Sequence, residues 1–414
     1  MKRNYIMLLL LIAPVLALAG QVKLEDAYRS ALQKTEFNAI LEAQIKQYEA
    51  RTEKAVSALF PPVSLKAGYS LQQATFAPGY SDAAVLGLNI TQPVYQGDQL
   101  TTALEESKLQ QKSKELQNKA LKLALYSSVA SGYYAVMTAE KDKKNIETVI
   151  TQTKEMIIEL EKRKVIGKSK YSEVLMTQAQ LAVLEADLEG VNRIILTLRE
   201  DFSFLTGLPR ETEFYEGKKT ESEMPEADFY LKASLNRPDI FALQADLEMA
   251  RFETAFQNAF GLPWVSLTGN IYPLRSGASA GINWDAGINI TMKLIDSGET
   301  GSKVKEAQYK EKEAELNLAK KKRQVETEVR SAIGNIKGLM EQVKILENAA
   351  EMNDKNYLEQ RKDYEFSLVT NLEVLQAMNS LQNAKRTLDR TKLELLLAGA
   401  KLQSVSALVP EENR

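Results

Sequence analysis

The feature that most constrains the fold of this chain is an internal duplication with an offset of 200 residues. Three short motifs recur at that spacing and in the same order along the chain. They are Ala50-Arg51 with Ala250-Arg251, Gly87-x-Asn89-Ile90-Thr91 with Gly287-x-Asn289-Ile290-Thr291, and Glu173-Val174-Leu175 with Glu373-Val374-Leu375. One match could arise by chance, but several at one offset imply two copies of one structural unit.

Both copies show the same order of periodic segments: a helix, two strands, a very long helix and a final helix. The helices are expected at 23–59, 99–163 and 172–205 in the first copy, and at 227–260, 301–363 and 372–403 in the second. Apolar residues seven apart, such as Val325, Ala332 and Leu339, predict helices packed side by side over several turns. A helix of about 65 residues is about 100 Å long, so two shorter helices stacked end to end would match one long helix.

The strand segments alternate between apolar and polar side chains, which point to opposite faces of a sheet. The four segments are expected at 63–71, 86–91, 265–271 and 282–294. The longer segments span about 9 to 13 residues, which suits a tilted strand that crosses a bilayer. Four strands cannot close a barrel, and open sheet edges are not tolerated in lipid. Either other chains complete the barrel, with twelve strands from three copies, or the sheet is half-buried on a soluble core.

Composition excludes much chemistry, because the chain contains no Cys and no His. Cys/His zinc sites, a Cys nucleophile and a Ser-His-Asp arrangement are therefore impossible. Lys and Arg total 53 against 55 for Asp and Glu, so no basic excess points to nucleic acid. We expect no enzymatic activity and no cofactor or metal.

The first residues are typical of an export signal. Lys2 and Arg3 precede an apolar run, and Ala17-Leu18-Ala19 fits the small-residue cleavage rule. We therefore divide the chain into a signal peptide (1–19), a first repeat (20–206), a linker (207–228), a second repeat (229–403) and a C-terminal tail (404–414). No later stretch is apolar enough to form a transmembrane helix.

With these features the chain resembles the TolC-type outer-membrane efflux proteins. The resemblance rests on the duplication, the element order and local motifs. The motifs are Asn236-Arg237-Pro238-Asp239-Ile240, the run from Thr91 to Gly97, and the helix-tip runs 163–175 and 364–375. It implies a mainly α fold with β-structure: a homotrimer whose twelve-stranded transmembrane barrel, four strands per protomer, continues as a long α-helical coiled-coil barrel. The protein would lie in the lipid of the cell outer membrane and extend into the periplasm.

The resemblance also implies a function and partners. The protein would be a passive exit duct of a tripartite efflux or type I secretion system. A periplasmic adaptor and an inner-membrane pump of the RND, ABC or MFS type would open its periplasmic tip. Residues 206–228, which break the helical pattern, resemble the family's equatorial region. The rival hypothesis is a soluble periplasmic coiled-coil adaptor or scaffold. Adaptors usually have one helical hairpin, whereas this sequence predicts two.

The same resemblance assigns roles to residues at the tip. Glu173 and Glu373 stand at acidic tip positions, and Tyr364 stands at a gate position. Three Glu373 carboxylates around a narrow axis would attract cations, although both glutamates could instead be solvated flank positions. The adaptor-contact residues are Ile166, Gly167, Lys168, Phe366, Ser367 and Leu368. Val369 replaces a basic gate residue, Gln376 replaces a second acidic residue, and Ser367 replaces a glycine.

Overall fold

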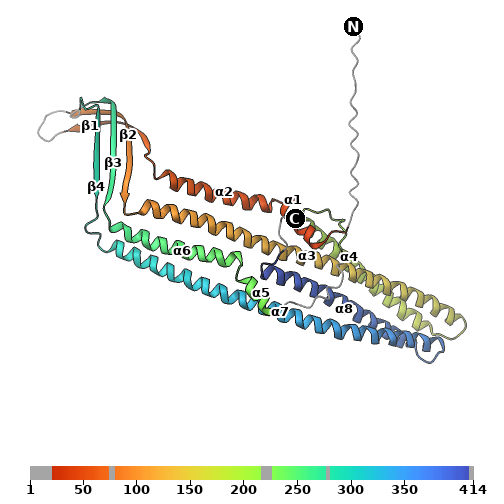
Figure 1. Ribbon diagram of the computed structural model, residues 1–414. Helices are drawn as coiled ribbons and strands as arrows, with labels where there is room; N and C mark the ends of the chain where they lie inside the picture. Colours follow the sequence, from red (N-terminus) through yellow and green to blue (C-terminus); the bar gives the residue numbers. More distant parts are fainter. Residues whose placement is uncertain (1–20, 74–79, 216–225, 277–279, 410–414) are drawn as a thin grey trace, which may run out of the picture.

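The protein is elongated, with a β-sheet at one end and two helical hairpins at the other (Figure 1). The computed structural model describes residues 21–73, 80–215, 226–276 and 280–409, so the predicted signal peptide lies outside the described residues. The first copy contains α1 (Leu24–Lys34), α2 (Glu36–Ser57), β1 (Val63–Gln73), β2 (Tyr80–Gln96), α3 (Gln99–Val165) and α4 (Tyr171–Thr206). The second contains α5 (Ala227–Ser234), α6 (Pro238–Asn258), η1 (Ala259–Gly261), β3 (Trp264–Arg275), β4 (Trp284–Thr291), α7 (Glu299–Glu365) and α8 (Asn371–Val405).

The four strands form one antiparallel sheet in the order β1-β2-β3-β4. The register places apolar side chains opposite one another on one face. The pairs include Leu65 with Leu88, Leu88 with Ile271, Ile271 with Trp284, and Leu267 with Ile288. These side chains are exposed in the single chain, Ile288 to 68% and Leu65 to 70%. The apolar face is therefore uncovered, and β1 and β4 are sheet edges without a partner among the described residues.

The opposite face of the sheet carries a continuous polar ladder across all four strands. The Ser64 hydroxyl lies 3.4 Å from Asn89 Oδ1, Asn89 Nδ2 donates to Asn270 Oδ1 at 2.7 Å, and Asn270 Nδ2 donates to Asp285 Oδ1 at 2.6 Å. Arg275 continues the ladder to the second oxygen of Asp285 at 3.5 Å. Side-chain hydrogen bonds thus join residues far apart in sequence and fix the strand register. The sheet has one apolar face and one polar face crossed by a ladder of side-chain hydrogen bonds.

All four strands differ in length from the sequence prediction, β2 and β4 most instructively. The alternating pattern predicts a fourth strand at 282–294, but β4 ends at Thr291. The turn that follows contains Ser297 and Gly298 with positive φ angles of 54° and 89°, and Asp296 accepts hydrogen bonds from the Gly298 and Thr300 N–H groups. This local turn chemistry, which satisfies the first backbone donors of α7, overrides the alternation. β2 is longer than predicted and spans Tyr80–Gln96.

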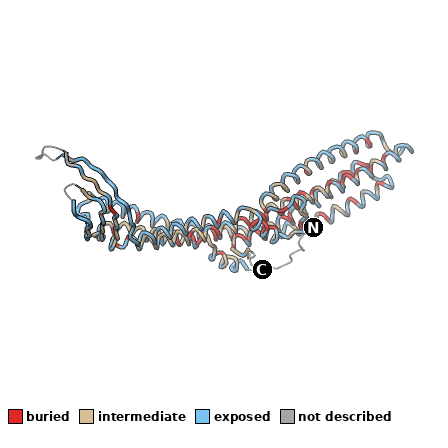
Figure 2. The backbone as a smooth tube through the Cα atoms, turned by 90° about the horizontal axis from the view of Figure 1, so that it is seen from above, coloured by how far each residue is buried: buried red, intermediate tan, exposed pale blue. Residues whose placement is uncertain are grey.

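The helices form a single curved layer in which the two long helices run the full length (Figures 1 and 2). Near the sheet, α2 contacts α3, α3 contacts α6, and α6 contacts α7. Toward the tip, α4 contacts α3, α3 contacts α8, and α8 contacts α7. The predicted end-to-end stacking of short helices beside each long one is therefore confirmed. No helix in the described part of the chain is sufficiently long and apolar to span a membrane.

The expected first helix of each copy is interrupted, so both predictions of one continuous helix are wrong. In the first copy Thr35 is extended, and its hydroxyl oxygen accepts from the Phe37 N–H at 3.3 Å as the N-cap of α2. In the second copy Pro238 begins α6. Proline disfavours the helical conformation of the residue before it, and Arg237 is accordingly extended.

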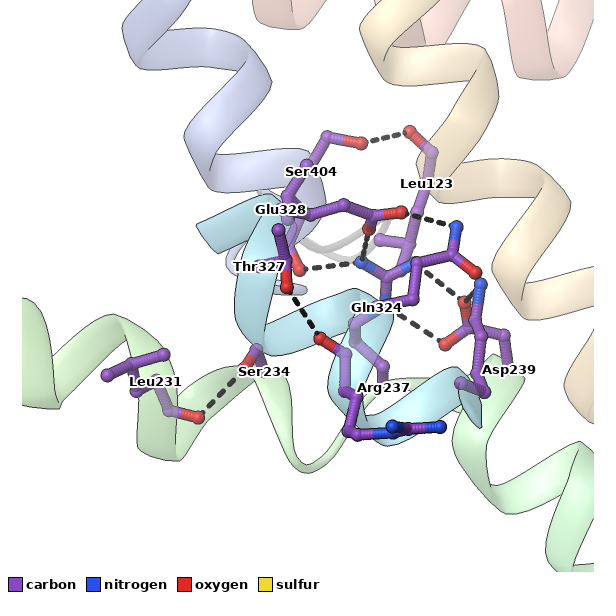
Figure 3. A network of polar contacts seen from close by, with 12 residues as sticks. Leu123, Leu231, Ser234, Arg237, Asp239, Gln324, Thr327, Glu328 and Ser404 are labelled. Carbon is purple, nitrogen blue, oxygen red and sulfur yellow. Dashed lines mark hydrogen bonds and ion pairs between the residues drawn. The ribbon is translucent and has the colours of Figure 1, made fainter. Parts of the chain in front are cut away.

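Arg237 occupies the joint where the end of α8 meets the start of α6 (Figure 3). Its guanidinium donates to Asp239 Oδ2 at 2.6 Å, to Glu328 Oε2 of α7 at 3.0 Å, and to the Val405 carbonyl of α8 at 3.1 Å. The cation thus neutralises the negative C-terminus of α8, while Asp239 lies in the positive first turn of α6. One side chain therefore connects three helices of the second copy.

The carboxyl of Asp239 is held ionised by this joint. Burial alone would raise the pKa of Asp239, but hydrogen bonds from Arg237 and Lys321, with the charges of these two residues, hold it below its usual range. The Lys321 ammonium lies 3.0 Å from Asp239 Oδ2. Asp239 therefore contributes to stability only while it stays deprotonated.

The largest apolar cluster lies halfway along α3 and joins both copies. Tyr133 is 2% exposed and packs edge-on against Phe214 at 5.0 Å between ring centroids. Phe214 in turn packs against Phe202 of α4 at 5.1 Å. The Tyr133 hydroxyl lies 2.8 Å from the carbonyls of both Val22 and Tyr215. The described part of the predicted equatorial region therefore packs on the middle of the helical layer.

Candidate functional site at the helical tip

The tip consists of two helical turns with the same backbone geometry, here called the first tip (residues 159–175) and the second tip (359–375). In the first, Gly167 has a φ of 74°, and the Lys168 N–H donates to the Arg163 carbonyl at 2.9 Å. In the second, Ser367 has a φ of 59°, and the Leu368 N–H donates to the Asp363 carbonyl at 2.9 Å. Both long helices therefore end in the left-handed C-terminal motif that glycine favours.

Exchanging the residues at these two turns is expected to have opposite effects on stability. Ser367→Gly removes the steric cost of a left-handed side-chain-bearing residue and should stabilise the protomer by about 0.5–1 kcal/mol, after the entropy of the unfolded chain is counted. Gly167→Ser should destabilise by a similar amount, because a Cβ there meets no atom within 4 Å and only backbone strain changes. Thermal unfolding of the purified protein measures both, and shifts of the same sign would contradict this interpretation.

Glu373 lies at the start of α8 and forms a capping box with Thr370. Its carboxylate accepts from the Thr370 N–H at 2.6 Å and from the Thr370 hydroxyl at 2.8 Å. In return the Thr370 hydroxyl oxygen accepts from the Glu373 N–H at 3.4 Å. The backbone and hydroxyl hydrogen bonds from Thr370 hold the pKa of Glu373 below its usual range. Glu373 is therefore an exposed, ionised carboxylate whose position is fixed by its own helix.

Glu173 lies at the equivalent place in α4 but has different neighbours. Its carboxylate accepts from the Lys170 N–H at 3.3 Å and from the Ser169 hydroxyl. Lysine has no acceptor atom, so Lys170 cannot cap the N–H of Glu173 as Thr370 caps that of Glu373. Both carboxylates thus accept hydrogen bonds at the start of their helices. The backbone N–H of Glu173, however, lacks the side-chain acceptor that Thr370 gives to Glu373.

Tyr364 connects the second tip to the first. It is 7% exposed, and the Arg163 guanidinium lies over its ring at 4.2 Å from the centroid. Arg163 also donates to the Tyr364 carbonyl at 3.1 Å. Burial raises the pKa of Tyr364; the Arg163 charge opposes this rise, and Glu159 and Glu173 add to it. The sequence places Val369 where a basic gate residue is expected, and the structure supplies a basic partner for Tyr364 from the other hairpin.

Further polar contacts tie the two hairpins together above the tip. The buried Asn371 of α8 donates to the buried Thr177 hydroxyl of α4 at 3.1 Å. Higher up, Asp142 of α3 is 5% exposed and accepts from Arg386 Nε and Arg390 Nε of α8, each at 2.9 Å. A carboxylate with two cations is the compensated form that a buried charge requires. Several separate polar contacts therefore hold the two hairpins together.

The predicted adaptor-contact residues all lie at the extreme end of the molecule. Ile166 is 65% exposed, Phe366 69% and Leu368 72%. Gly167, Lys168 and Ser367 are also exposed. These large apolar side chains are therefore uncovered in the single chain.

Sequence reasoning missed several of these contacts. The pattern Thr370-x-x-Glu373 before an apolar run is a capping-box signature and could have been found. The pairing of Arg163 with Tyr364 and the cluster of Asp142 with Arg386 and Arg390 could not, because they join residues about 200 or more positions apart. Nothing local in the sequence specifies such partners.

Comparison with known proteins places this architecture in a family. The profile of the outer membrane efflux protein family matches residues 28–207 and 230–407, one match for each copy. The chain belongs to this family. The TolC-type resemblance drawn from the sequence is confirmed.

Individual members of the outer membrane efflux protein family support the same assignment. "Outer membrane protein TolC" of Vibrio cholerae is 23% identical over 381 residues, which are 88% of this chain and 86% of that protein. The outer membrane channel CmeC of Campylobacter jejuni has a TM-score of 0.83 at 18% identity, covering 94% of this chain and 87% of CmeC. The outer membrane protein VceC of Vibrio cholerae has a TM-score of 0.80 at 19% identity, covering 92% and 95%. The predicted fold class is therefore confirmed for the protomer.

Proposed function

We propose that three copies of this chain form an outer-membrane exit duct that extends into the periplasm. The observation that carries the proposal is the two-faced sheet with unpaired edges. The exposed apolar face suits lipid, the polar ladder suits a watery lumen, and open edges require neighbouring strands. Three sheets of four strands would close a barrel of twelve strands. Side chains fill the interior of an eight-stranded barrel, whereas a twelve-stranded barrel is wide enough to keep an aqueous interior.

The helical layer supports the same assembly. One of its edges is formed by α2 and α4, and the other by α7. Both edges leave large apolar side chains exposed, including Ile194 and Leu196 of α4 and Ile345 and Met352 of α7. Three layers joined edge to edge would cover these side chains and form a tube below the barrel. The duct would be passive, with adaptor and inner-membrane pump supplying energy and opening the tip.

The soluble adaptor or scaffold hypothesis lacks comparable support. It would leave the apolar face of the sheet in water without an occupant. Family membership also favours a channel without catalytic activity, since the relatives described above are outer-membrane proteins and channels.

Isolation of the mature protein tests the proposal. We expect it in the outer-membrane fraction as a trimer that dissociates only on heating before gel electrophoresis, and we expect ion conductance in planar bilayers. Recovery as a soluble periplasmic monomer without conductance would refute the proposed function.

Replacement of Glu373 tests the proposed selectivity ring. Glu373→Gln keeps an acceptor for the Thr370 N–H but removes three charges from the trimer's tip. Because a ring of carboxylates attracts cations, cation preference should fall, and the reversal potential in a salt gradient should move toward zero. Glu365→Gln, at an exposed position on the same tip, is the control for general surface charge. An unchanged reversal potential in Glu373→Gln would place the selectivity elsewhere.

A further inference from the structure

The two tips share a backbone but carry opposite charge. Residues 159–175 include five basic and three acidic side chains, whereas residues 359–375 include two basic and four acidic ones. The hydrogen bonds that close the turns are the same in both, so the difference lies only in the side chains. In a trimer the tips would alternate around a ring, basic next to acidic.

The lysines of the first tip are exposed and available for a partner. The Lys164 ammonium lies 4.1 Å from the centroid of the Tyr171 ring. Lys168 and Lys170 are exposed, and their ammonium groups form no ion pair with any described residue. The Glu173 carboxylate is already engaged by the Lys170 N–H and the Ser169 hydroxyl. Lys164, Lys168 and Lys170 therefore lie around an apolar end, and none of the three forms an ion pair with a described residue.

That apolar end consists of Val165 and Ile166, which are 86% and 65% exposed. An apolar centre with a charged rim is the usual anatomy of a protein interface. The charged rim sets which partner is accepted, because like charges repel and opposite charges steer the encounter. The first tip thus fits a surface with an apolar centre and an acidic rim.

We propose that the first tip docks onto an acidic helical end of a periplasmic partner protein, and that the second tip does not share this partner surface. The inference rests on the proposed function, in which a periplasmic adaptor meets the tip. Its new content is the unequal chemistry of the two tips. Six equivalent docking contacts around the ring are therefore not expected; three acidic contacts alternate with three of another kind.

An anionic membrane surface is a poorer fit than an acidic protein. Arg163 contacts Tyr364, so two tips of opposite net charge are neighbours in each protomer. At physiological ionic strength charges interact over about 8 Å. A flat anionic surface would attract one tip and repel its neighbour, whereas a protein can present acidic groups to the first tip alone.

The test uses the full-length trimer in detergent and two soluble helical-hairpin probes. The probes are identical except that one carries glutamates and the other lysines at its loop end. We expect the acidic probe to bind more tightly than the basic one, with an affinity that falls as salt rises. Lys168→Glu/Lys170→Glu should weaken binding of the acidic probe by about tenfold or more.

The matched control makes the same charge change away from the tip. Lys119→Glu/Lys144→Glu replaces two exposed lysines of α3, the nearer of them about 30 Å from the tip at 1.5 Å per residue. Binding of the acidic probe should be unchanged in this variant. Equal loss in both variants would mean only a general charge effect and would overturn the proposal.

The remaining outcomes separate the inference from the proposed function. Conductance of the wild-type trimer is measured in parallel, and its absence would refute the duct itself. A conducting trimer that binds both probes equally would refute only the inference. The last outcome concerns lipid. If phosphatidylglycerol vesicles retain the wild-type trimer but not Lys168→Glu/Lys170→Glu, and the trimer binds both probes equally, the lysines bind lipid. That result would also overturn the inference.

Discussion

Arginine in place of Ile288 is expected to prevent accumulation of the trimer in the outer membrane, whereas arginine in place of the adjacent Asn289 should be tolerated. Ile288 lies in the middle of β4 on the apolar face, opposite Leu267. If this face meets lipid, an arginine costs roughly 2–4 kcal/mol in each copy near the bilayer centre. Three copies in one barrel multiply that cost.

Asn289 is the matched control because it differs from Ile288 by one position and points to the other face. It donates to the Thr268 hydroxyl at 3.1 Å, so its replacement loses one neutral hydrogen bond, worth about 1 kcal/mol. The long cation would then stand in an aqueous lumen. Outer-membrane fractionation and the yield of heat-modifiable trimer measure both variants. Loss of Asn289→Arg with survival of Ile288→Arg would mean that the faces are inverted.

The two faces of β4 are well defined, because the alternation of apolar and polar residues and the strand register assign the same residues to the apolar face. Apolar residues spaced two apart predict that Ile288 and Ile290 share a face, and the pairing with Leu267 and Val265 places all four together. Alternation cannot predict the polar ladder, however, since hydrogen bonds between Asn89 and Asn270 depend on which strands are neighbours. That neighbourhood is a property of the assembled sheet.

The long helices could be predicted closely from the sequence. Expected bounds of 99–163 and 301–363 compare with Gln99–Val165 and Glu299–Glu365. Heptads repeated over many turns outweigh any single residue, so the ends move by only two positions. The short helices show the converse, because one cap at Thr35 or one proline at Pro238 decides whether an interruption exists.

The tip residues could be located but their chemistry could not. Position alone groups Glu173 with Glu373 as equivalent acids. The structure distinguishes them through the preceding cap residue, which is Lys170 in one copy and Thr370 in the other. Tyr364 was expected at a gate, and its contact with Arg163 follows from packing between hairpins that no pattern specifies. Its role in gating stays a prediction.

Removal of the Arg237 side chain is expected to destabilise the helical part of the protomer strongly. Arg237→Ala deletes hydrogen bonds to Asp239, Glu328 and the Val405 carbonyl. It also removes the cation that pairs with the carboxylates of Asp239 and Glu328. The Arg237 side chain is 13% exposed, so water replaces these bonds only in part. A loss of about 2–4 kcal/mol per protomer follows from removing one partner of a largely buried pair.

Two further variants separate the contribution of the joint from that of charge in general. Arg330→Ala removes an arginine of α7 that is 64% exposed and pairs only along its own helix with Glu326. Such exposed pairs contribute roughly 0–1 kcal/mol, so little change is expected. The loss of stability in Arg237→Lys should lie between the losses in Arg330→Ala and Arg237→Ala. The lysine ammonium keeps the charge but lacks the planar guanidinium that reaches three acceptors. Equal stability of Arg237→Ala and Arg330→Ala would contradict the assigned role.

The pH dependence of stability identifies the mechanism. Because the pKa of Asp239 is lowered in the folded protein, its contribution is fully present above the unfolded value of about 3.9 and is lost as pH falls through the folded value. In Arg237→Ala that lowering is largely removed, since only Lys321 remains beside Asp239. The gap in thermal midpoint between wild type and Arg237→Ala should therefore be widest near neutral pH and narrow below pH of about 4. A gap that stays constant through this range would mean that Arg237 acts by packing alone and not by holding an ionised carboxylate at the joint.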